Sequence, residues 1–194
     1  MTPPDVAETL PVGVWTTAIT GVVTFTSSPF RDDRGQFARL FDRGDLAPVH
    51  QDRPIVQINH SITREPGTIR GMHFQQAPFL EAKWVRCLRG RVLDVAVDLR
   101  RGSPTFLHHV AVELDAQAMS ALLIPEGCAH GFQVLEADSE LLYLHTAAYA
   151  PQAEGGLRWD DPRLGIAWPL PPTGISARDG SHALLSADYQ GIEA

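Results

Sequence analysis

Two stretches decide the fold: Arg70-Gly71-Met72-His73-Phe74-Gln75, continued by Glu81 to Gly90, and Pro125-Glu126-Gly127-Cys128-Ala129-His130-Gly131-Phe132. The chain between them alternates, because large aliphatic residues are separated by small or acidic ones in Leu93-Asp94-Val95-Ala96-Val97-Asp98-Leu99. A period of two predicts a β-strand, since successive side chains of a strand point to opposite faces. The polar residues of both stretches are therefore expected beside strands.

The rest of the chain also predicts short strands joined by turns. Its 194 residues include 16 Gly and 15 Pro, which favour many turns over long helices. Further strands are expected within 12–26, 55–59, 110–114, 121–124 and 140–149. A polar turn is expected at 29–35, a loop with one helical turn at 42–53, and a turn-rich C-terminal part at 150–194. The prediction is an all-β sandwich or barrel in one domain.

Composition excludes several classes of protein. A net charge of −7 without a run of Lys or Arg argues against a nucleic-acid partner. Residues 1–8 resemble no targeting signal and no apolar run has the length of a membrane span, so we expect a cytoplasmic protein with no membrane partner. Two cysteines cannot form a disulfide framework, and Cys87 is expected to be a small buried residue. Phosphate-binding, nucleophile-elbow and zinc-protease motifs are missing.

The two opening stretches resemble the metal-binding motifs of a cupin barrel, in which His-x-His, a Glu and a last His hold a metal ion. His73 and His130 occupy the first and last ligand positions, but Gln75 replaces the second His and Lys83 replaces the Glu. An ammonium group repels a divalent cation, whereas it can stabilise an oxyanion with its fixed positive charge. We therefore expect electrophilic stabilisation without a metal or other cofactor.

A wider set of motifs resembles the dTDP-4-dehydrorhamnose 3,5-epimerase family. It comprises Arg70–Gln75, Lys83, Val95–Arg100, Ser103-Pro104-Thr105, Pro125–Phe132, Tyr143 and Trp159-Asp160-Asp161-Pro162. The resemblance runs from about Phe30 to Asp179. It implies a cupin-type jelly-roll barrel with short helices and an irregular C-terminal segment, as one domain over 1–194 with its core at about 30–179. It also implies a homodimer with shared active sites, and the apolar N-terminal segment is a candidate for pairing with the other subunit.

The implied reaction is metal-independent epimerisation of a dTDP-4-keto-6-deoxyhexose at C3, C5 or both, in the biosynthesis of rhamnose or an antibiotic sugar. A base removes a proton beside the ketone, the enolate forms at O4, and an acid returns a proton to the opposite face. By resemblance, His73 is the base and Asp179 orients it. Lys83 stabilises the enolate with His130 beside it, and Tyr143 is the acid.

The resemblance also implies seven substrate-binding residues. Three contact the substrate directly (Arg70, Gln57 and Asn59), and two reach across the dimer to the nucleotide (Arg34 and Phe30). Tyr149 would stack on the thymine, and Arg178 would meet the diphosphate.

Other polar and aromatic residues have plainer interpretations. His108, His109 and His145 are expected to be structural or solvated, Trp159 and Trp168 to pack in the core or a lid, and Asp160 and Asp161 to cap turns. Three positions depart from the family pattern. Arg39 stands where many members have Glu and is expected to alter contacts across the dimer, while Trp84 for Leu and Cys128 for Phe are expected to alter the pocket's shape.

Three alternatives remain open. One is an epimerase of a single carbon in a secondary-metabolite sugar pathway. Another is a metal-dependent cupin enzyme, which metal analysis would reveal. The third is a sugar-nucleotide-binding cupin without catalysis, which would bind ligand but exchange no proton with solvent.

Overall fold

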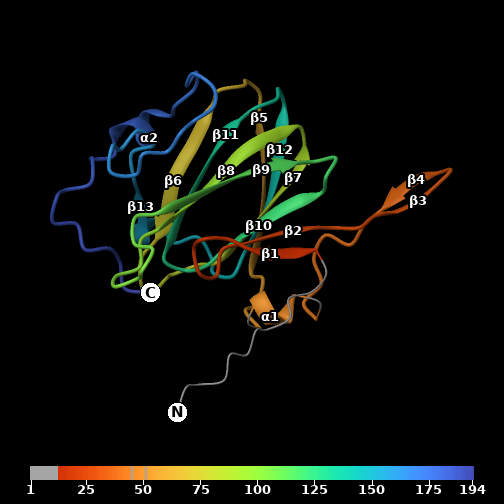
Figure 1. Cartoon of the computed structure of the whole chain (residues 1–194), viewed down its shortest axis with the longest axis horizontal. Helices are drawn as coiled ribbons and strands as arrows, with labels where there is room; N and C mark the ends of the chain where they lie inside the picture. Colours follow the sequence, from red (N-terminus) through yellow and green to blue (C-terminus); the bar gives the residue numbers. More distant parts are fainter. Residues whose placement is uncertain (1–12, 45, 51) are drawn as a thin grey trace, which may run out of the picture.

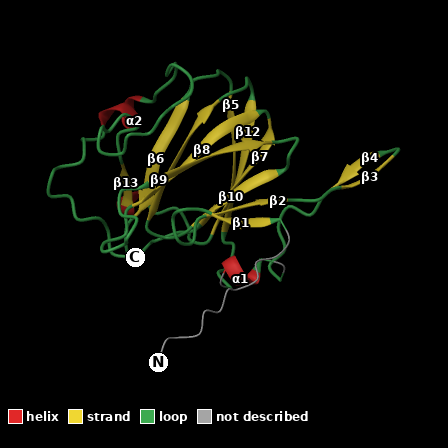
Figure 2. Ribbon diagram, in the orientation of Figure 1, coloured by secondary structure: helices red, strands yellow, loops and turns green. Residues whose placement is uncertain are grey.

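The computed structural model describes residues 13–44, 46–50 and 52–194, and residues 1–8, which bear on localisation, lie outside these ranges. Two large antiparallel sheets face each other, and all pairings between the named strands are antiparallel. Helices are short and few, as Figure 2 shows. The all-β jelly roll expected from the sequence is confirmed. Among the described residues, no helix is long and apolar enough to cross a membrane.

The first sheet has six strands, and its edges are the N-terminal strand β1 and the strand β5. In spatial order they are β1 (Val14–Thr16), β2 (Val23–Thr26), β10 (Ser120–Ile124), β7 (Lys83–Arg89), β12 (Ser139–His145) and β5 (Gln57–Thr63). The strand expected within 140–149 is therefore confirmed in its first part.

The second sheet has five strands, and the alternating stretch lies inside it as β8. In spatial order they are β13 (Glu154–Gly156), β6 (Ile69–Gln75), β11 (Cys128–Val134), β8 (Arg91–Asp98) and β9 (His109–Asp115). The helices are α1 (Ala47–His50), the 3-10 turn η1 (Pro151–Ala153) and α2 (Ala177–Ser181).

The core has three parts: one between the two sheets, one on the outer face of the second sheet, and one around Trp84 on the outer face of the first sheet. Between the sheets, Val85 of β7 and Leu122 of β10 pack with Ala96 of β8 and Phe132 of β11. On the other face of β8, the alternating aliphatic residues pack against the C-terminal segment, including Trp168, Tyr189 and Ile192. Both faces of this sheet are thus covered, and residues on either side of the expected core, 30–179, join these clusters.

A small hairpin projects away from the body of the molecule (Figure 1). It consists of β3 (Phe30–Asp32) and β4 (Gly35–Phe37), so the turn expected at 29–35 was wrong in extent. Only Asp33 and Arg34 connect the strands. All six strand residues are exposed, so neither face had to be apolar and the sequence carried no alternating pattern.

Candidate active site

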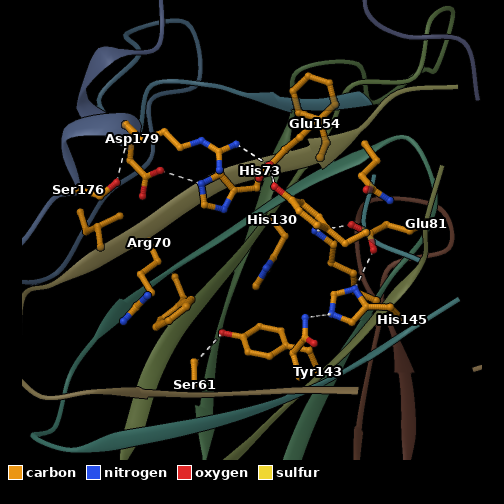
Figure 3. A pocket seen from close by; sticks show the side chains of 18 of the residues that line it. Ser61, Arg70, His73, Glu81, His130, Tyr143, His145, Glu154, Ser176 and Asp179 are labelled. Carbon is orange, nitrogen blue, oxygen red and sulfur yellow. Dashed lines mark hydrogen bonds and ion pairs between the residues drawn. The ribbon is translucent and has the colours of Figure 1, made fainter. Parts of the chain in front are cut away.

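A pocket of about 980 Å³ lies between the two sheets, and ten of the twelve site residues expected from the sequence line it. Its side chains come from β5, β7 and β12 of the first sheet, from β6, β11 and β13 of the second, and from α2 (Figure 3). The volume is within the range of small-molecule sites. The resemblance-based residues therefore meet in one cavity although they are spread over 122 positions of sequence, from Gln57 to Asp179.

Two glycines of the opening stretches bring β6 and β11 unusually close together. A Cβ on Gly71 would lie 2.5 Å from Cα of Gly131, and one on Gly131 would lie 2.9 Å from the carbonyl oxygen of Arg70. Only glycine fits such an approach. His73 and His130 are partners across this strand pair, so the approach sets both imidazoles on the pocket wall.

His73 is bonded to a carboxylate from the C-terminal segment. Its Nε2 lies 2.8 Å from Oδ1 of Asp179. Two backbone N–H groups hold Asp179 in place. That of Gly71 donates to Oδ2 of Asp179, and that of Asp179 itself donates to Oγ of Ser176. With Nε2 donating to the carboxylate, Nδ1 is the nitrogen left to accept a proton.

Burial and charge act in opposite directions on this pair. Burial lowers the pKa of His73 below its ordinary value of 6.5, although Asp179 works against that shift. Burial alone would raise the pKa of Asp179, but the hydrogen bond and charge of His73 outweigh it and hold that pKa below its usual value. The imidazole is therefore neutral and able to act as a base at neutral pH.

His130 is fixed from behind by a second carboxylate. Its Nε2 lies 2.9 Å from Oδ1 of the fully buried Asp94, whose Oδ2 is buried with no hydrogen-bond partner among the described residues. The ring packs edge-on against Tyr143, with centroids 6.1 Å apart. His130 is thus held rigidly at the floor of the pocket.

Lys83 is nearly enclosed and forms an ion pair with Glu81. Its Nζ lies 3.0 Å from Oε1 of Glu81, which stands just before β7. The other carboxylate oxygen lies 2.7 Å from Nδ1 of His145. His145, expected to be structural or solvated, instead lines the pocket beside Glu81. Lys83 therefore presents its charge from within a polar cluster.

Tyr143 lines the pocket from the first sheet, on the same face of β12 as His145. Its hydroxyl lies 3.1 Å from Oγ of Ser61 on β5. Burial raises the pKa of Tyr143 well above its ordinary value. The phenol is therefore neutral at physiological pH and holds a proton that it can donate.

Three of the expected substrate contacts form further parts of the wall. Arg70 is steadied by a 3.0 Å hydrogen bond from Nε to Oγ1 of Thr63. Gln57 and Asn59 follow each other along one face of β5 and are hydrogen-bonded to each other at 3.2 Å. All three line the pocket.

The more exposed end of the pocket carries an aromatic ring and a cation. Tyr149 is 54% exposed, and its hydroxyl donates to Oε2 of Glu154 at 2.5 Å. A guanidinium nitrogen of Arg178 lies 2.7 Å from the same oxygen. An exposed aromatic face beside a guanidinium is suited to a base and a phosphate group.

Arg34 and Phe30 are not brought to this pocket. Both belong to the projecting hairpin, where the Arg34 side chain is 90% exposed and Phe30 is 78% exposed. Phe30 and Phe37 border a second, smaller cavity of about 360 Å³ at the base of the hairpin. That the hairpin reaches into another subunit stays a prediction.

Two of the three departures from the family pattern lie elsewhere than expected, and the effect of Arg39 on contacts across a dimer stays a prediction. Trp84 packs against Phe25 and Phe41 in the core, and Cys128 is buried between the sheets. Neither lines the pocket, so the expectation that they alter its shape was wrong. Trp84 lies on the face of β7 opposite Lys83, whereas Cys128 shares a face of β11 with His130 and packs beside the pocket in the core. Arg39 lies 3.1 Å from Asp42 near the hairpin.

The cupin metal positions are used for other contacts. The amide of Gln75 donates to the carbonyls of Phe79 and Ala148 and accepts from the backbone of Ala150, so it holds a loop. A different group, His73, Asp179 and His182, has ligand atoms within 4.8 Å of one another. A divalent cation there would compete with the hydrogen bond between His73 and Asp179. The absence of a metal requirement stays a prediction.

Among the pocket residues that were not expected from the sequence, four have side chains that bond the side chains of expected site residues: Ser61, Glu81, His145 and Glu154. Glu81 stands two residues before Lys83, and His145 two residues after Tyr143 on the same strand face. Period-two spacing therefore offered a signal for His145. Nothing in the sequence showed that Glu81 and His145, 64 residues apart, would meet.

Comparisons with known proteins agree with this geometry. A family model described as dTDP-4-dehydrorhamnose 3,5-epimerase matches residues 16–187. The dTDP-4-dehydrorhamnose 3,5-epimerase of Sinorhizobium fredii is 43% identical over 157 residues, which cover 80% of this chain and 80% of the relative.

Solved structures are similar over most of the chain. The dTDP-6-deoxy-D-glucose-3,5-epimerase of Legionella pneumophila, in complex with dTDP-4-keto-L-rhamnose, has a TM-score of 0.86 at 33% identity, over 93% of this chain and 98% of that one. ChmJ, a 3'-monoepimerase from Streptomyces bikiniensis in complex with dTDP-quinovose, has a TM-score of 0.81 at 34% identity, over 87% of this chain and 85% of that one.

Proposed function

Because the chain belongs to the dTDP-4-dehydrorhamnose 3,5-epimerase family and is an epimerase of dTDP-sugars, we propose that its pocket inverts a dTDP-4-keto-6-deoxyhexose at C3, C5 or both. One observation carries the proposal. The His73–Asp179 pair, Lys83 and Tyr143 line the same pocket, with the base and the acid on different sheets.

His73 removes the proton from a carbon beside the C4 ketone. Nδ1 of the neutral imidazole accepts the proton, and Asp179 then stabilises the imidazolium through the bond at Nε2. The C–H electron pair moves to O4, which becomes an enolate oxygen. Lys83 supplies the positive charge for that oxygen, and His130 borders the same region.

Tyr143 returns a proton to the other face of the carbon. It stands on the first sheet, whereas His73 stands on the second, so the two groups can flank a sugar ring held between them. The nucleotide occupies the exposed end, where Tyr149 stacks on the base and Arg178 meets the diphosphate. Arg70, Gln57 and Asn59 contact the sugar or the phosphates.

Proton NMR of the purified protein with dTDP-4-keto-6-deoxyglucose in D2O tests the reaction. Deuterium at C3 and C5 with inversion at both identifies a 3,5-epimerase, and deuterium at one carbon identifies a single-centre epimerase. Absence of exchange at both carbons would contradict the proposal and favour a binding protein.

The reaction proceeds without a metal, because the would-be ligand positions hold Lys83 in an ion pair and Gln75 in backbone contacts. The rate of deuterium exchange into the substrate should be unchanged after the protein is treated with EDTA and dialysed. Loss of exchange that is restored by a divalent cation would support the metal-dependent alternative instead.

The active enzyme is a cytoplasmic homodimer in which the hairpin of one subunit supplies Phe30 and Arg34 to the pocket of the other. The exposure of both side chains supports this assignment. Mixing Arg34→Ala with His73→Asn protein tests it, since a mixed dimer contains one pocket with both native residues. Recovery of activity on mixing is expected, and no recovery despite subunit exchange would contradict the shared site.

A further inference from the structure

Glu81 is an enclosed carboxylate that contacts two pocket residues at once. Its side chain is 9% exposed, those of Lys83 and His145 are 11% and 10% exposed, and the two bonds are 3.0 and 2.7 Å long. Figure 3 shows Glu81 and His145 together on the side of the pocket away from Asp179. An enclosed ammonium needs an anion within hydrogen-bond distance, and Glu81 provides it.

A chain of hydrogen bonds that starts at a backbone N–H group determines which ring nitrogen of His145 carries the proton. The N–H of Tyr149 can only donate, and it donates to Oε1 of Gln57 at 3.0 Å. The NH₂ end of Gln57 therefore faces Oδ1 of Asn59, at 3.2 Å. This leaves the NH₂ end of Asn59 facing Nε2 of His145, also at 3.2 Å.

The direction of this chain has a consequence for both ring nitrogens. Because Nε2 of His145 accepts from Asn59, the neutral imidazole carries its proton on Nδ1 and donates it to Glu81. Burial alone would raise the pKa of Glu81, but the His145 hydrogen bond and the Lys83 charge outweigh it and lower that pKa. Glu81 thus receives two donors, one on each oxygen, and remains an anion.

We propose that Glu81 and His145 are positioning residues for Lys83, and that the chain Tyr149–Gln57–Asn59–His145 holds Glu81 as the anion that aims the ammonium into the pocket. The inference rests on the proposed role of Lys83 at the enolate oxygen. It also links the nucleotide end of the pocket to the reacting end, since Tyr149 begins the chain and Lys83 ends it.

Two substitutions of His145 distinguish the hydrogen bond made by Nδ1 from the one made by Nε2. In His145→Asn the amide nitrogen takes the place of Nδ1 and can still donate to Glu81. In His145→Gln the amide reaches the place of Nε2 and can still accept from Asn59, but the donor to Glu81 is lost. We expect kcat to fall about 10- to 100-fold in His145→Gln, with KM little changed, and much less in His145→Asn. Equal losses, or the reverse order, would overturn the assignment.

Glu81→Gln tests the carboxylate without changing its shape. Whichever way the new amide turns, its NH₂ group faces a donor, either Lys83 or Nδ1 of His145. We expect a similar fall in kcat, with Glu81→Asp recovering part of it because the charge is kept. A Glu81→Gln enzyme with native kcat would overturn the proposal.

Glu140→Gln is the matched control. Glu140 lies on the same strand as His145, and its carboxylate also bonds a histidine and a cation, His60 at 3.1 Å and Arg89 at 3.8 Å. Glu140 does not line the pocket, and its partner His60, which does, is not among the proposed catalytic or binding residues, so we expect native kcat and KM. A loss of kcat equal to that of Glu81→Gln would mean that removing either carboxylate acts through folding, and it would overturn the positioning role of Glu81.

The wild-type protein is assayed alongside by deuterium exchange, and folding is checked by thermal unfolding and by dTDP binding. Absence of exchange in the wild type would overturn the proposed function and this inference with it. Exchange in the wild type together with native kcat in Glu81→Gln and His145→Gln would overturn this inference alone.

Discussion

The two walls of the pocket each hold a histidine bonded to a carboxylate, but the histidines differ at their second nitrogen. On the wall formed by β6 and α2, His73 bonds Asp179 through Nε2, and among the described residues Nδ1 has no hydrogen-bond partner. On the wall formed by β7 and β12, His145 bonds Glu81 through Nδ1 and Asn59 through Nε2. A histidine–carboxylate pair is therefore our proposed base on one wall and our proposed fixed support on the other.

Replacing the proposed base should cause the largest loss of activity, and comparing it with the same substitution on the other wall tests whether the two histidines differ. His73→Asn removes the proton acceptor, so we expect exchange at C3 and C5 to fall by about 10³-fold or more. Steady-state kinetics and deuterium incorporation measure the loss. His145→Asn, the same substitution on the other wall, should lose far less. Similar losses in the two variants would mean that the walls do not differ in this way.

Tyr143→Phe should separate removal of the proton from its return. The phenol gives a proton to the face opposite His73, so the variant should keep part of its deuterium exchange while inverted product falls by about 100-fold. NMR follows exchange and inversion in one sample. Ser61→Ala is the control, because it removes only the 3.1 Å hydrogen bond to the hydroxyl. Equal loss of exchange and inversion in Tyr143→Phe would argue against the acid role.

The sequence predicted the two walls unequally. The wall with His73 and its strand partner His130 was identified from contiguous motifs. On the other wall, Lys83 and Tyr143 were named but the pair Glu81 and His145 was missed, because the contact of that pair depends on how the end of β12 meets the start of β7. Distance along the chain does not explain the difference, since Asp179, 106 residues from His73, was expected beside it from a family motif and does bond it in the pocket. Nothing in the sequence offered a reason to expect that two isolated polar residues, Glu81 and His145, would be enclosed together.

The fold shows the same division. Strands with an alternating sequence were found, among them β8, whose large aliphatic residues share the face that packs against the C-terminal segment. The hairpin β3–β4 was missed because exposed strands need no such pattern. The orientation of Trp84 toward the core was also missed, since a resemblance to neighbours of Lys83 says nothing about which face a side chain takes.

Asp179→Asn should change the pH dependence of the base wall in a defined direction. Burial lowers the pKa of His73 and Asp179 opposes that shift, so removal of the carboxylate should lower this pKa further. The acid limb of kcat/KM should then move to lower pH, while the maximum falls about 10- to 100-fold because the imidazolium loses its partner. A pH profile of both proteins measures this. Movement of the limb to higher pH would contradict the proposed electrostatics.

The same substitution has a consequence for stability. The folded-state pKa of Asp179 is lowered, so its contribution to stability is present above the pKa of the unfolded chain and is lost as pH falls through the folded value. Asp179→Asn cannot lose that contribution on acidification. Urea unfolding at pH 7 and pH 3 should therefore show a smaller decrease in stability for the variant than for the wild type.

Arg178→Ala should have the smallest effect and act on binding alone. The guanidinium lies at the exposed end of the pocket beside Glu154, where we propose that it meets the diphosphate, so we expect KM to rise about 10-fold with kcat nearly unchanged. Arg158→Ala is a matched control, since Arg158 forms a similar 2.6 Å pair with Asp160 outside the pocket. A change in kcat without a change in KM would place Arg178 with the catalytic walls, and the division between a binding end and a reacting end would then be wrong.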